Sequence, residues 1–365
     1  MKKQIHSWIK IWLVPGAVYQ SVIVGGGYGT GREVVEFISR FGPWNGLYAN
    51  ILIGLLMGLV MAVSFDFARQ FKALDYRTFF KQLLGPLWFL YEIVFLVTLL
   101  LVLAVTGSAA GEVLKDTFGL PSYAGIVLML LIVVLLNYFG RQWVAQTLTT
   151  WGLLMSLVLV VFVVATFVLR GDAIAASFAS DQGGGSWITS AFQFFLFNIF
   201  LVPVALYAAE HIQTRAQAWG AGMIGGFLAI FPGLIFHLSF MAGYPGVLEQ
   251  PIPTYWLLRD MGLEWLLLVY VVFLFGTIAQ TGVGVLQGIN ERLDNWWIEQ
   301  KGKPLRPELH SIIAAAAVLT SLLLANLGIV ALVAKGYGSL AWFSLGIYIL
   351  PILTLGVYQL YRSKP

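Results

Sequence analysis

The 365-residue chain contains no cysteine, and only 10% of its residues are charged. The absence of cysteine excludes disulfide bonds and cysteine-ligated metal sites. Soluble domains carry roughly 25% charged residues, so the low charge and the 59% hydrophobic content exclude an ordinary soluble domain. No polar stretch is long enough to form a separate one. We therefore predict an all-α polytopic membrane protein, with residues 1–365 forming a single membrane domain.

The lysine and arginine residues indicate topology rather than a nucleic-acid partner. If the N-terminus is cytoplasmic, 14 of the 21 lysines and arginines fall on the cytoplasmic side, Lys335 among them. Because cytoplasmic loops are enriched in these residues, we predict a cytoplasmic N-terminus in the cell membrane. With eleven spans, this assignment places Arg362 and Lys364 outside the cell, which argues against eleven. Ten spans and twelve spans are the alternatives.

Apolar runs predict about eleven membrane spans, because each needs ~20 mostly apolar residues. Between them, residues 72–85 suit an amphipathic helix on the membrane surface, and residues 243–262, with three prolines, suit an outer lid. Four glycines of the seventh span, at positions 220, 222, 225 and 226, suit close helix packing. The expected spans are residues 8–41 (broken), 45–69, 86–112, 122–139, 142–169, 187–210, 216–241, 263–290, 308–326, 327–337 (short) and 339–361.

A glycine-rich run interrupts the first span. Five of the seven residues from Gly25 to Gly31 are glycine, and each costs ~1 kcal/mol in a helix, so the run disfavours helix by roughly 5 kcal/mol. Unpaired backbone at membrane depth is tolerated only where it is buried in protein or lines a cavity. The run therefore predicts a binding site, formed by Gly25, Gly26, Gly27, Tyr28, Gly29, Thr30 and Gly31.

The sixth span carries a second interruption. Pro203 removes a backbone donor, and Asn198 places an amide at membrane depth, where polar groups are costly. Broken helices at matching positions in two halves mark transporter binding sites. We expect Phe197, Asn198 and Phe200 to complete the site. The predicted layout is a first repeat over 8–169, a second over 187–337 and an extra helix over 339–361.

Several motifs resemble one family. Residues 24–33 (VGGGYGTGRE), the Gly42-Pro43 turn, Asn290-Glu291-Arg292 and residues 325–338 are similar to the YkvI-like amino-acid permeases. These belong to the amino acid–polyamine–organocation (APC) superfamily with the LeuT-type fold. The resemblance implies a five-plus-five inverted repeat with broken helices 1 and 6 and a central substrate site.

The ends of the first break suggest what binds there. Carbonyl groups near Val24 suit an ammonium group, and N–H groups near Gly31 suit a carboxylate, so we predict a small zwitterion, such as an amino acid or a related amine. Arg32 and Glu36 are spaced for a local ion pair or for an outer gate. Glu33 is a further gate residue or a proton or cation site.

The sequence does not identify the coupling ion. The resemblance implies a sodium site between carbonyls near Val24 and hydroxyl residues on helix eight, where Thr277, Gln280 and Thr281 are the candidates. However, the adjacent hydroxyl pair of many LeuT-type transporters is absent, and helix five lacks the lysine of proton-coupled relatives. Lone threonines in membrane helices usually bond their own i−4 carbonyl. We predict no cofactor other than sodium or a proton.

The sequence favours transport over an enzymatic function. Ser339 and His237 form no protease motif, and no His-Glu-x-x-His is present, so an enzyme is not expected. Asp66 and Glu92 suggest either proton relays or ion pairs with Arg69 and Arg141. We predict a secondary transporter that works by alternating access, whose partners are a small solute and the lipid bilayer. The alternative is a ligand sensor that uses the same pocket without transport. The sequence does not indicate the oligomeric state.

Overall fold

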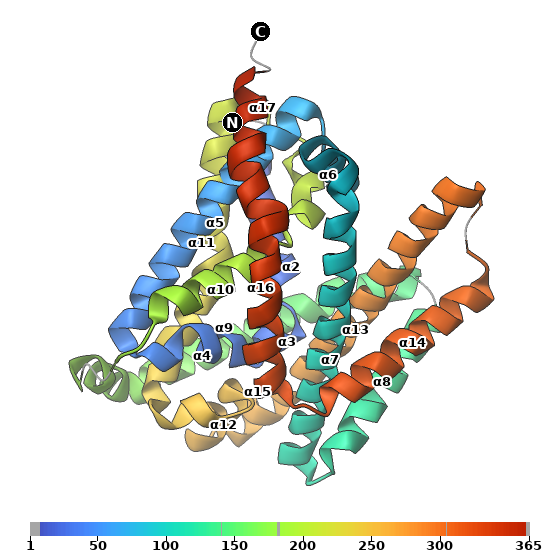
Figure 1. Cartoon of the computed structure of the whole chain (residues 1–365). Coiled ribbons are helices and arrows are strands. Elements are labelled where there is room, and N and C mark those ends of the chain that lie inside the picture. Colours follow the sequence, from blue (N-terminus) through green and yellow to red (C-terminus); the bar gives the residue numbers. More distant parts are fainter. Residues whose placement is uncertain (1–7, 140, 181–182, 304, 363–365) are drawn as a thin grey trace.

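The computed structural model describes residues 8–139, 141–180, 183–303 and 305–362. Within these residues the chain is helical and contains no strand. Both termini lie at one end of the molecule, and α12 and the start of the last helix lie at the other (Figure 1). We call these the terminal end and the lid end.

The first half of the chain contains the broken first span and four long helices. The first span consists of α2 (Val14–Ile23), α3 (Gly26–Gly29) and α4 (Arg32–Phe37), followed by η1 (Ser39–Phe41). The remaining elements of this half are α5 (Pro43–Phe71), α6 (Tyr76–Leu84), η2 (Gly85–Trp88), α7 (Phe89–Phe118), α8 (Ser122–Phe139) and α9 (Arg141–Ser180).

The second half begins with the broken sixth span, formed by α10 (Trp187–Ile199) and η3 (Val202–Ala209). The lid, residues 243–262, follows α11 and contains short helices. In chain order the other elements are α11 (Arg215–Phe240), η4 (Met241–Gly243), η5 (Gly246–Glu249), α12 (Pro253–Asp260), α13 (Glu264–Lys301), α14 (Pro307–Ala325), α15 (Ile329–Ala331), η6 (Leu332–Tyr337), α16 (Gly338–Ser344), η7 (Leu345–Ile349), η8 (Ile352–Gly356) and α17 (Val357–Arg362).

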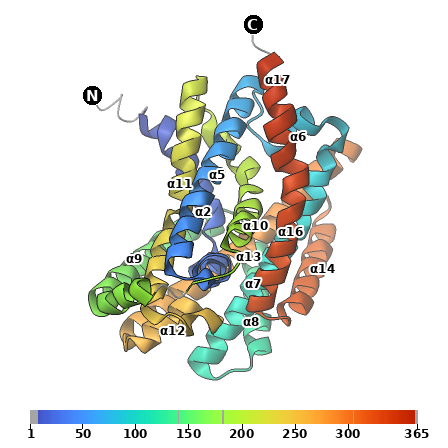
Figure 2. The same ribbon diagram turned by 60° about the vertical axis from the view of Figure 1, so that its left-hand side comes forward.

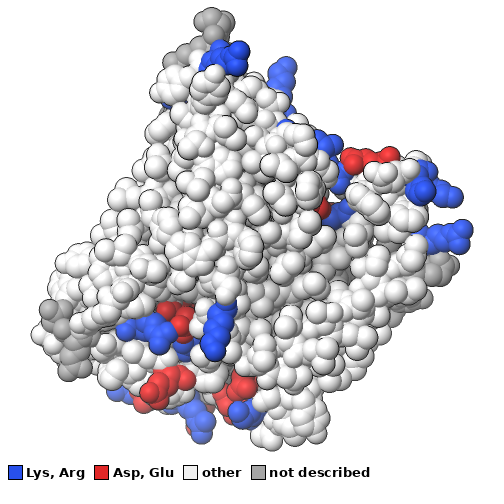
Figure 3. All heavy atoms as spheres, viewed as in Figure 1, with Lys and Arg blue, Asp and Glu red and all other residues white. Residues whose placement is uncertain are grey.

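The lengths of these helices confirm a multi-pass membrane protein. Six are long and apolar enough to cross a bilayer, and α10 with η3 forms a seventh such segment, bent by 56°. Two shorter apolar helices, Ser122–Leu135 and Ile312–Ala325, lie among them. On the face shown in Figure 3, charged side chains gather toward the two ends, as expected for a protein surrounded by lipid.

The expected division of the C-terminal region into spans 327–337 and 339–361 is wrong. Ile329–Arg362 is one continuous helix, because π-helical segments at Leu332–Tyr337, Leu345–Ile349 and Ile352–Gly356 keep its backbone paired with a shifted register. The last helix therefore ends at the terminal end of the molecule (Figure 1). Lys335, for which the sequence predicts the cytoplasmic side, is exposed near the lid-end start of this helix.

Glycines set the distance between the most closely packed helices. Helix α5 packs along α11, and α2 packs on α11 as well (Figure 2). A Cβ atom added to Gly226 would lie 2.2 Å from the backbone nitrogen of Gly58, and one on Gly222 would lie 2.3 Å from that of Ala62. The expected close packing of the seventh span is confirmed. Helix α2, which ends at the first break, packs on α11 at the same interface, where a Cβ added to Gly16 would lie 2.5 Å from the Cα atom of Gly225.

We expect Gly226→Ala to destabilise the protein, because its methyl group would force α5 and α11 apart. Overpacking of this kind costs about 1–3 kcal/mol. The control is Gly346→Ala on the last helix, where an added Cβ meets no atom within 4 Å. Thermal unfolding of the purified protein in detergent should show a lower midpoint for Gly226→Ala only. Equal midpoints for the two variants would contradict the close approach.

Candidate functional site

The first helix breaks where the sequence predicts it. Helix α2 ends at Ile23, and Val24 leaves helical geometry with φ −83° and ψ 74°. A continuous helix would pair the Gly25 N–H with the carbonyl of Ser21, but this N–H donates to Ile23 at 3.0 Å. The Ser21 carbonyl thus loses its helical partner. The carbonyl end of α2 is therefore available at the break, as the zwitterion hypothesis requires.

The break differs from the prediction by one extra helical turn. Residues Gly26–Gly29 form α3, which precedes the expected start of α4 after Gly31. Gly31 has φ +81°, a conformation that strongly favours glycine. Two tertiary bonds hold this segment: Tyr270 Oη donates to the Gly29 carbonyl at 3.0 Å, and the Thr254 N–H donates to the Thr30 carbonyl at 3.3 Å. Bonds from α13 and the lid thus satisfy backbone that the break exposes.

The sixth helix is also broken. It bends between Ile199 and Val202, where the Leu201 N–H donates to the Asn198 carbonyl at 3.0 Å. The Tyr91 hydroxyl on α7 donates to the carbonyl of Phe200 at 3.1 Å. Both predicted interruptions are therefore present, and both are stabilised by bonds from other helices.

A large cavity of about 1380 Å³ runs from the first break toward the terminal end. Its mouth lies beside the start of α6 and the C-terminal part of α13, where Asp75, Glu291 and Asn295 are exposed, and the exposed residues Val160, Val164 and Phe231 line it farther along the helices. Its walls are mostly apolar. Its polar side chains away from the mouth are uncharged, and they come from α2, α7, α9 and α13: Gln20, Ser21, Thr98, Ser156, Thr277, Gln280 and Thr281.

The predicted site residues divide into two groups. Val24, Gly25, Thr277, Gln280 and Thr281 line this cavity. The others for which burial is described lie in the protein interior beyond its lining: Tyr28, Gly29, Thr30, Gly31, Phe197, Asn198 and Phe200. For Gly26 and Gly27 the structure describes the backbone only.

Specific contacts hold the aromatic and amide residues of this second group. The ring of Phe197 stacks on Tyr337 at 4.0 Å, and that of Phe200 lies 4.6 Å from Tyr91. The amide of Asn198 donates to the Phe194 carbonyl at 3.0 Å, one turn back in its own helix. In this conformation, therefore, the sixth helix contributes Leu201, Pro203 and Val204 to the cavity instead.

Sequence reasoning missed the face that α2 presents to the cavity. Ala17, Gln20, Ser21 and Val24 follow helical spacing and all line it. The spacing could have identified a common face, but not which face of α2 points inward. Gln20 is already engaged, since its amide donates to the Leu228 carbonyl at 2.7 Å.

On α13 the two predicted threonines make the back-bonds expected of lone hydroxyls. Thr277 Oγ1 donates to the Phe273 carbonyl at 2.8 Å, and Thr281 Oγ1 donates to the Thr277 carbonyl at 3.0 Å. The break lies directly beside them, because a Cβ on Gly25 would sit 3.2 Å from Thr281 Oγ1. Between them, Gln280 Oε1 is buried without a hydrogen-bond partner among the described residues. The structure thus brings together the break and the helix-eight residues named from the sequence.

Arg32 connects the first helix to the lid. Its Nη1 atom donates to the carbonyls of Leu248 and Gln250 at 2.9 and 3.1 Å, and its Nη2 atom bonds Glu36. Arg40 pairs with the same carboxylate from a more exposed position. The expected local ion pair is therefore present, and the same guanidinium also holds two lid carbonyls. Only 3% of Arg32 is exposed, so these bonds lie in the interior.

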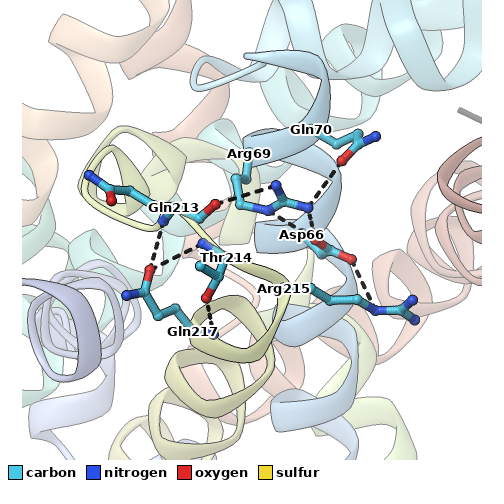
Figure 4. A network of polar contacts seen from close by, with 7 residues as sticks. All are labelled: Asp66, Arg69, Gln70, Gln213, Thr214, Arg215 and Gln217. Atoms are coloured by element: carbon cyan, nitrogen blue, oxygen red, sulfur yellow. Dashed lines mark hydrogen bonds and ion pairs between the residues drawn. The ribbon is translucent and has the colours of Figure 1, made fainter. Parts of the chain in front are cut away.

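The two intramembrane carboxylates expected near the cytoplasm both form ion pairs. Asp66 pairs with Arg69 at 2.7 Å and with Arg215 at 3.5 Å, in a network that joins α5 to the start of α11 (Figure 4). Glu92 pairs with Arg292 at 3.1 Å, a partner that the sequence did not suggest. The expected alternative partner, Arg141, has a side chain outside the described part of the structure. Arg292 also lines the cavity near its mouth.

The residues considered for a protease do not form a catalytic pair. The ring nitrogens of His237 bond the Ser39 hydroxyl at 3.0 Å and the Pro43 carbonyl at 2.8 Å. Ser339 is exposed on a different helix. Because the Pro43 carbonyl can only accept, Nε2 donates to it and Nδ1 accepts from the Ser39 hydroxyl, so both ring nitrogens are bonded to groups other than Ser339.

Comparison with known proteins agrees with this geometry. No family model matches the chain. The chain is similar to the uncharacterized membrane protein YkvI of Bacillus subtilis (strain 168), with 23% identity over 344 residues that cover 90% of this chain and 91% of YkvI. This similarity confirms the resemblance seen in the sequence motifs.

Solved structures identify the fold. The inward-facing conformation of Mhp1 matches with a TM-score of 0.59 and 15% identity, covering 92% of this chain and 76% of that chain. A manganese transporter of Eremococcus coleocola, in complex with an aromatic bis-isothiourea substituted compound, matches with a TM-score of 0.46 and 13% identity, covering 96% and 94%. The chain has the LeuT-type fold, with broken helices 1 and 6.

Proposed function

We propose that this protein is a secondary transporter that carries a small zwitterionic solute across the cell membrane by alternating access. The observation that carries this proposal is a cavity that reaches the first break and has no lid residue in its lining. Arg32 and the lid cover the break from the lid end. A broken helix that a cavity reaches from one end and that is covered at the other end fits one state of a transporter with two alternating states.

The chemistry of the cavity supports an amino acid or a related amine as the substrate. The carbonyl end of α2 attracts an ammonium group, and the N–H end of α4 attracts a carboxylate. The deeper polar side chains are amides and hydroxyls without net charge, so a solute without net charge needs no opposite charge from them. Gln280 lines the cavity, and its Oε1 atom is buried without a hydrogen-bond partner among the described residues; a rotation of this side chain into the cavity supplies an acceptor for an N–H group of the solute.

The coupling ion is sodium or a proton. The hydrogen bonds that Thr277 and Thr281 donate to carbonyls of their own helix are compatible with a sodium site, because a hydroxyl that donates its hydrogen keeps lone pairs for a cation. Gly25, beside Thr281, places the break next to these oxygens. Val24 ends α2 at the same point, so its carbonyl is the further ligand that we propose.

We propose that the terminal end is cytoplasmic. The return of the chain to this end moves Arg362 to the side that already carries most of the lysine and arginine, which strengthens the bias typical of cytoplasmic loops. In this orientation the cavity opens to the cytoplasm and the lid faces outward.

Uptake into sealed proteoliposomes tests transport. We expect uptake of at least one amino acid from a radiolabelled mixture, and a loss of at least about tenfold in Gly25→Val, whose side chain would enter the space beside Thr281. The control is Gly346→Ala, because a Cβ there meets no atom within 4 Å and Gly346 is not part of the cavity lining. A sodium gradient and a pH gradient, applied separately, identify the coupling ion. If amino acids stabilise the protein thermally but never accumulate in or exchange across vesicles, the sensor alternative replaces this proposal.

The absence of cysteine makes alternating access directly measurable with single reporters. Ser21 is exposed in the cavity, whereas Thr254 is fully buried on the inner side of the lid. We expect the Ser21→Cys variant to react rapidly with a membrane-impermeant thiol reagent from the terminal side, and Thr254→Cys to react slowly from the lid side. Conditions that change one rate should change the other in the opposite direction. Rates that rise and fall together would contradict two alternating states.

Arg32→Ala should open the lid end. It removes charge-assisted hydrogen bonds to two lid carbonyls, and such bonds contribute roughly 1.5–3 kcal/mol each. Labelling of Thr254→Cys should therefore accelerate by about tenfold or more. Arg40→Ala is the matched control, since Arg40 shares the Glu36 carboxylate but is 49% exposed. An equal acceleration in both variants would assign the effect to Glu36 and not to the lid contacts.

A further inference from the structure

Glu33 differs from the other carboxylates that the structure buries. It is 5% exposed and lies in α4, between the first break and the lid. Asp66, Glu36 and Glu92 each pair with arginine. Among the described residues, Glu33 has no hydrogen bond or ion pair.

Two tyrosines are the polar neighbours of this carboxyl group. Tyr28 and Tyr337 lie close enough to interact with it electrostatically, and both are almost completely buried. The hydroxyl of Tyr28 has no hydrogen-bond partner among the described residues. A negative charge here would therefore be desolvated and without a counter-charge, which is strongly unfavourable.

Charged groups on the elements packed against α4 are engaged elsewhere or exposed. Arg32 and Arg40 pair with Glu36, and both ring nitrogens of His237 on α11 are bonded. Glu249 of η5 and Lys335 of η6 are exposed, α3 contributes only Tyr28, and α10 and α15 contain no titratable side chain. None of these supplies the missing counter-charge.

We propose that Glu33 is a proton-binding site that controls the lid-end gate. Its carboxyl group holds a proton while the lid and α4 are closed together. When the lid separates from α4, water reaches the group, its O–H bond breaks and the proton passes to water on the lid side. Closing the gate therefore takes up one proton. This inference rests on the proposed alternation between two states. The proton then binds one of these states more tightly and shifts their relative populations.

Linkage gives the sign of the pH effect. Because the closed state binds one more proton than the open state, raising the pH favours opening, by at most about tenfold per pH unit for one proton. Lowering the pH favours closure until both states are protonated. A permanently neutral side chain at position 33 removes this dependence and favours the closed state at every pH.

The test measures the labelling rate of Thr254→Cys from the lid side as a function of pH. Each rate is normalised to that of exposed Ser180→Cys at the same pH, which removes the titration of the thiol itself. We expect a rate that rises with pH, and a slow, pH-independent rate in Glu33→Gln. Glu249→Gln is the matched control, because it neutralises an exposed lid carboxylate; it should keep the dependence. Labelling of Ser21→Cys from the terminal side verifies that Glu33→Gln is folded.

The outcomes separate this inference from the proposed function. Opposite changes of the two reporters on addition of an amino acid, without any pH dependence of Thr254→Cys labelling, would overturn the role of Glu33 and leave alternating access intact. An unchanged pH dependence in Glu33→Gln would do the same. Reporters that never change in opposite directions would remove alternating access itself, and the gate with it.

Discussion

The broken first helix depends on bonds that other segments make to its backbone. In lipid, each unpaired backbone group costs several kcal/mol, so a glycine run without hydrogen-bond partners from other segments would destabilise the fold. Tyr270 on α13 and Thr254 in the lid supply donors to the carbonyls of Gly29 and Thr30. The break is thus tied to the two elements that must move relative to it if access alternates. Any movement of the lid exposes the Thr30 carbonyl, and water or a solute must then replace the lost bond.

The two ends of the molecule are held by different interactions. At the terminal end, Asp66, Arg69 and Arg215 join α5 to α11, which also pack through glycines. At the lid end, Arg32 of α4 donates to two lid carbonyls, and the Thr254 N–H donates to the Thr30 carbonyl at the first break. A packed glycine interface resists separation because its fit is specific, whereas a few hydrogen bonds can be exchanged for bonds to water. The structure therefore places its separable contact at the lid.

The sequence predicted the features that depend on local chemistry. The glycine run and Pro203 each disfavour helix on their own, so both breaks were foreseeable, as was the i, i+4 pair of Arg32 and Glu36. Features that depend on distant partners were not: Arg32 bonds Leu248 and Gln250, more than 200 residues away, and Glu92 pairs with Arg292 rather than a nearer arginine. The prediction of a helix interruption near residue 338 was wrong for another reason. Glycines at positions 336 and 338 are also compatible with π-helical turns, and composition does not distinguish a broken helix from a helix with shifted pairing.

The number of bonds at the lid also bounds how a ligand could drive the transition. Reversing a population from 1:99 to 99:1 requires a difference in binding free energy of about 5.5 kcal/mol between the two states. Arg32 contributes two bonds to lid carbonyls at roughly 1.5–3 kcal/mol each, which is of that size. A solute that bonds the ends of the broken helix, or a proton on Glu33, can therefore rebalance the two states without rearranging the helix core.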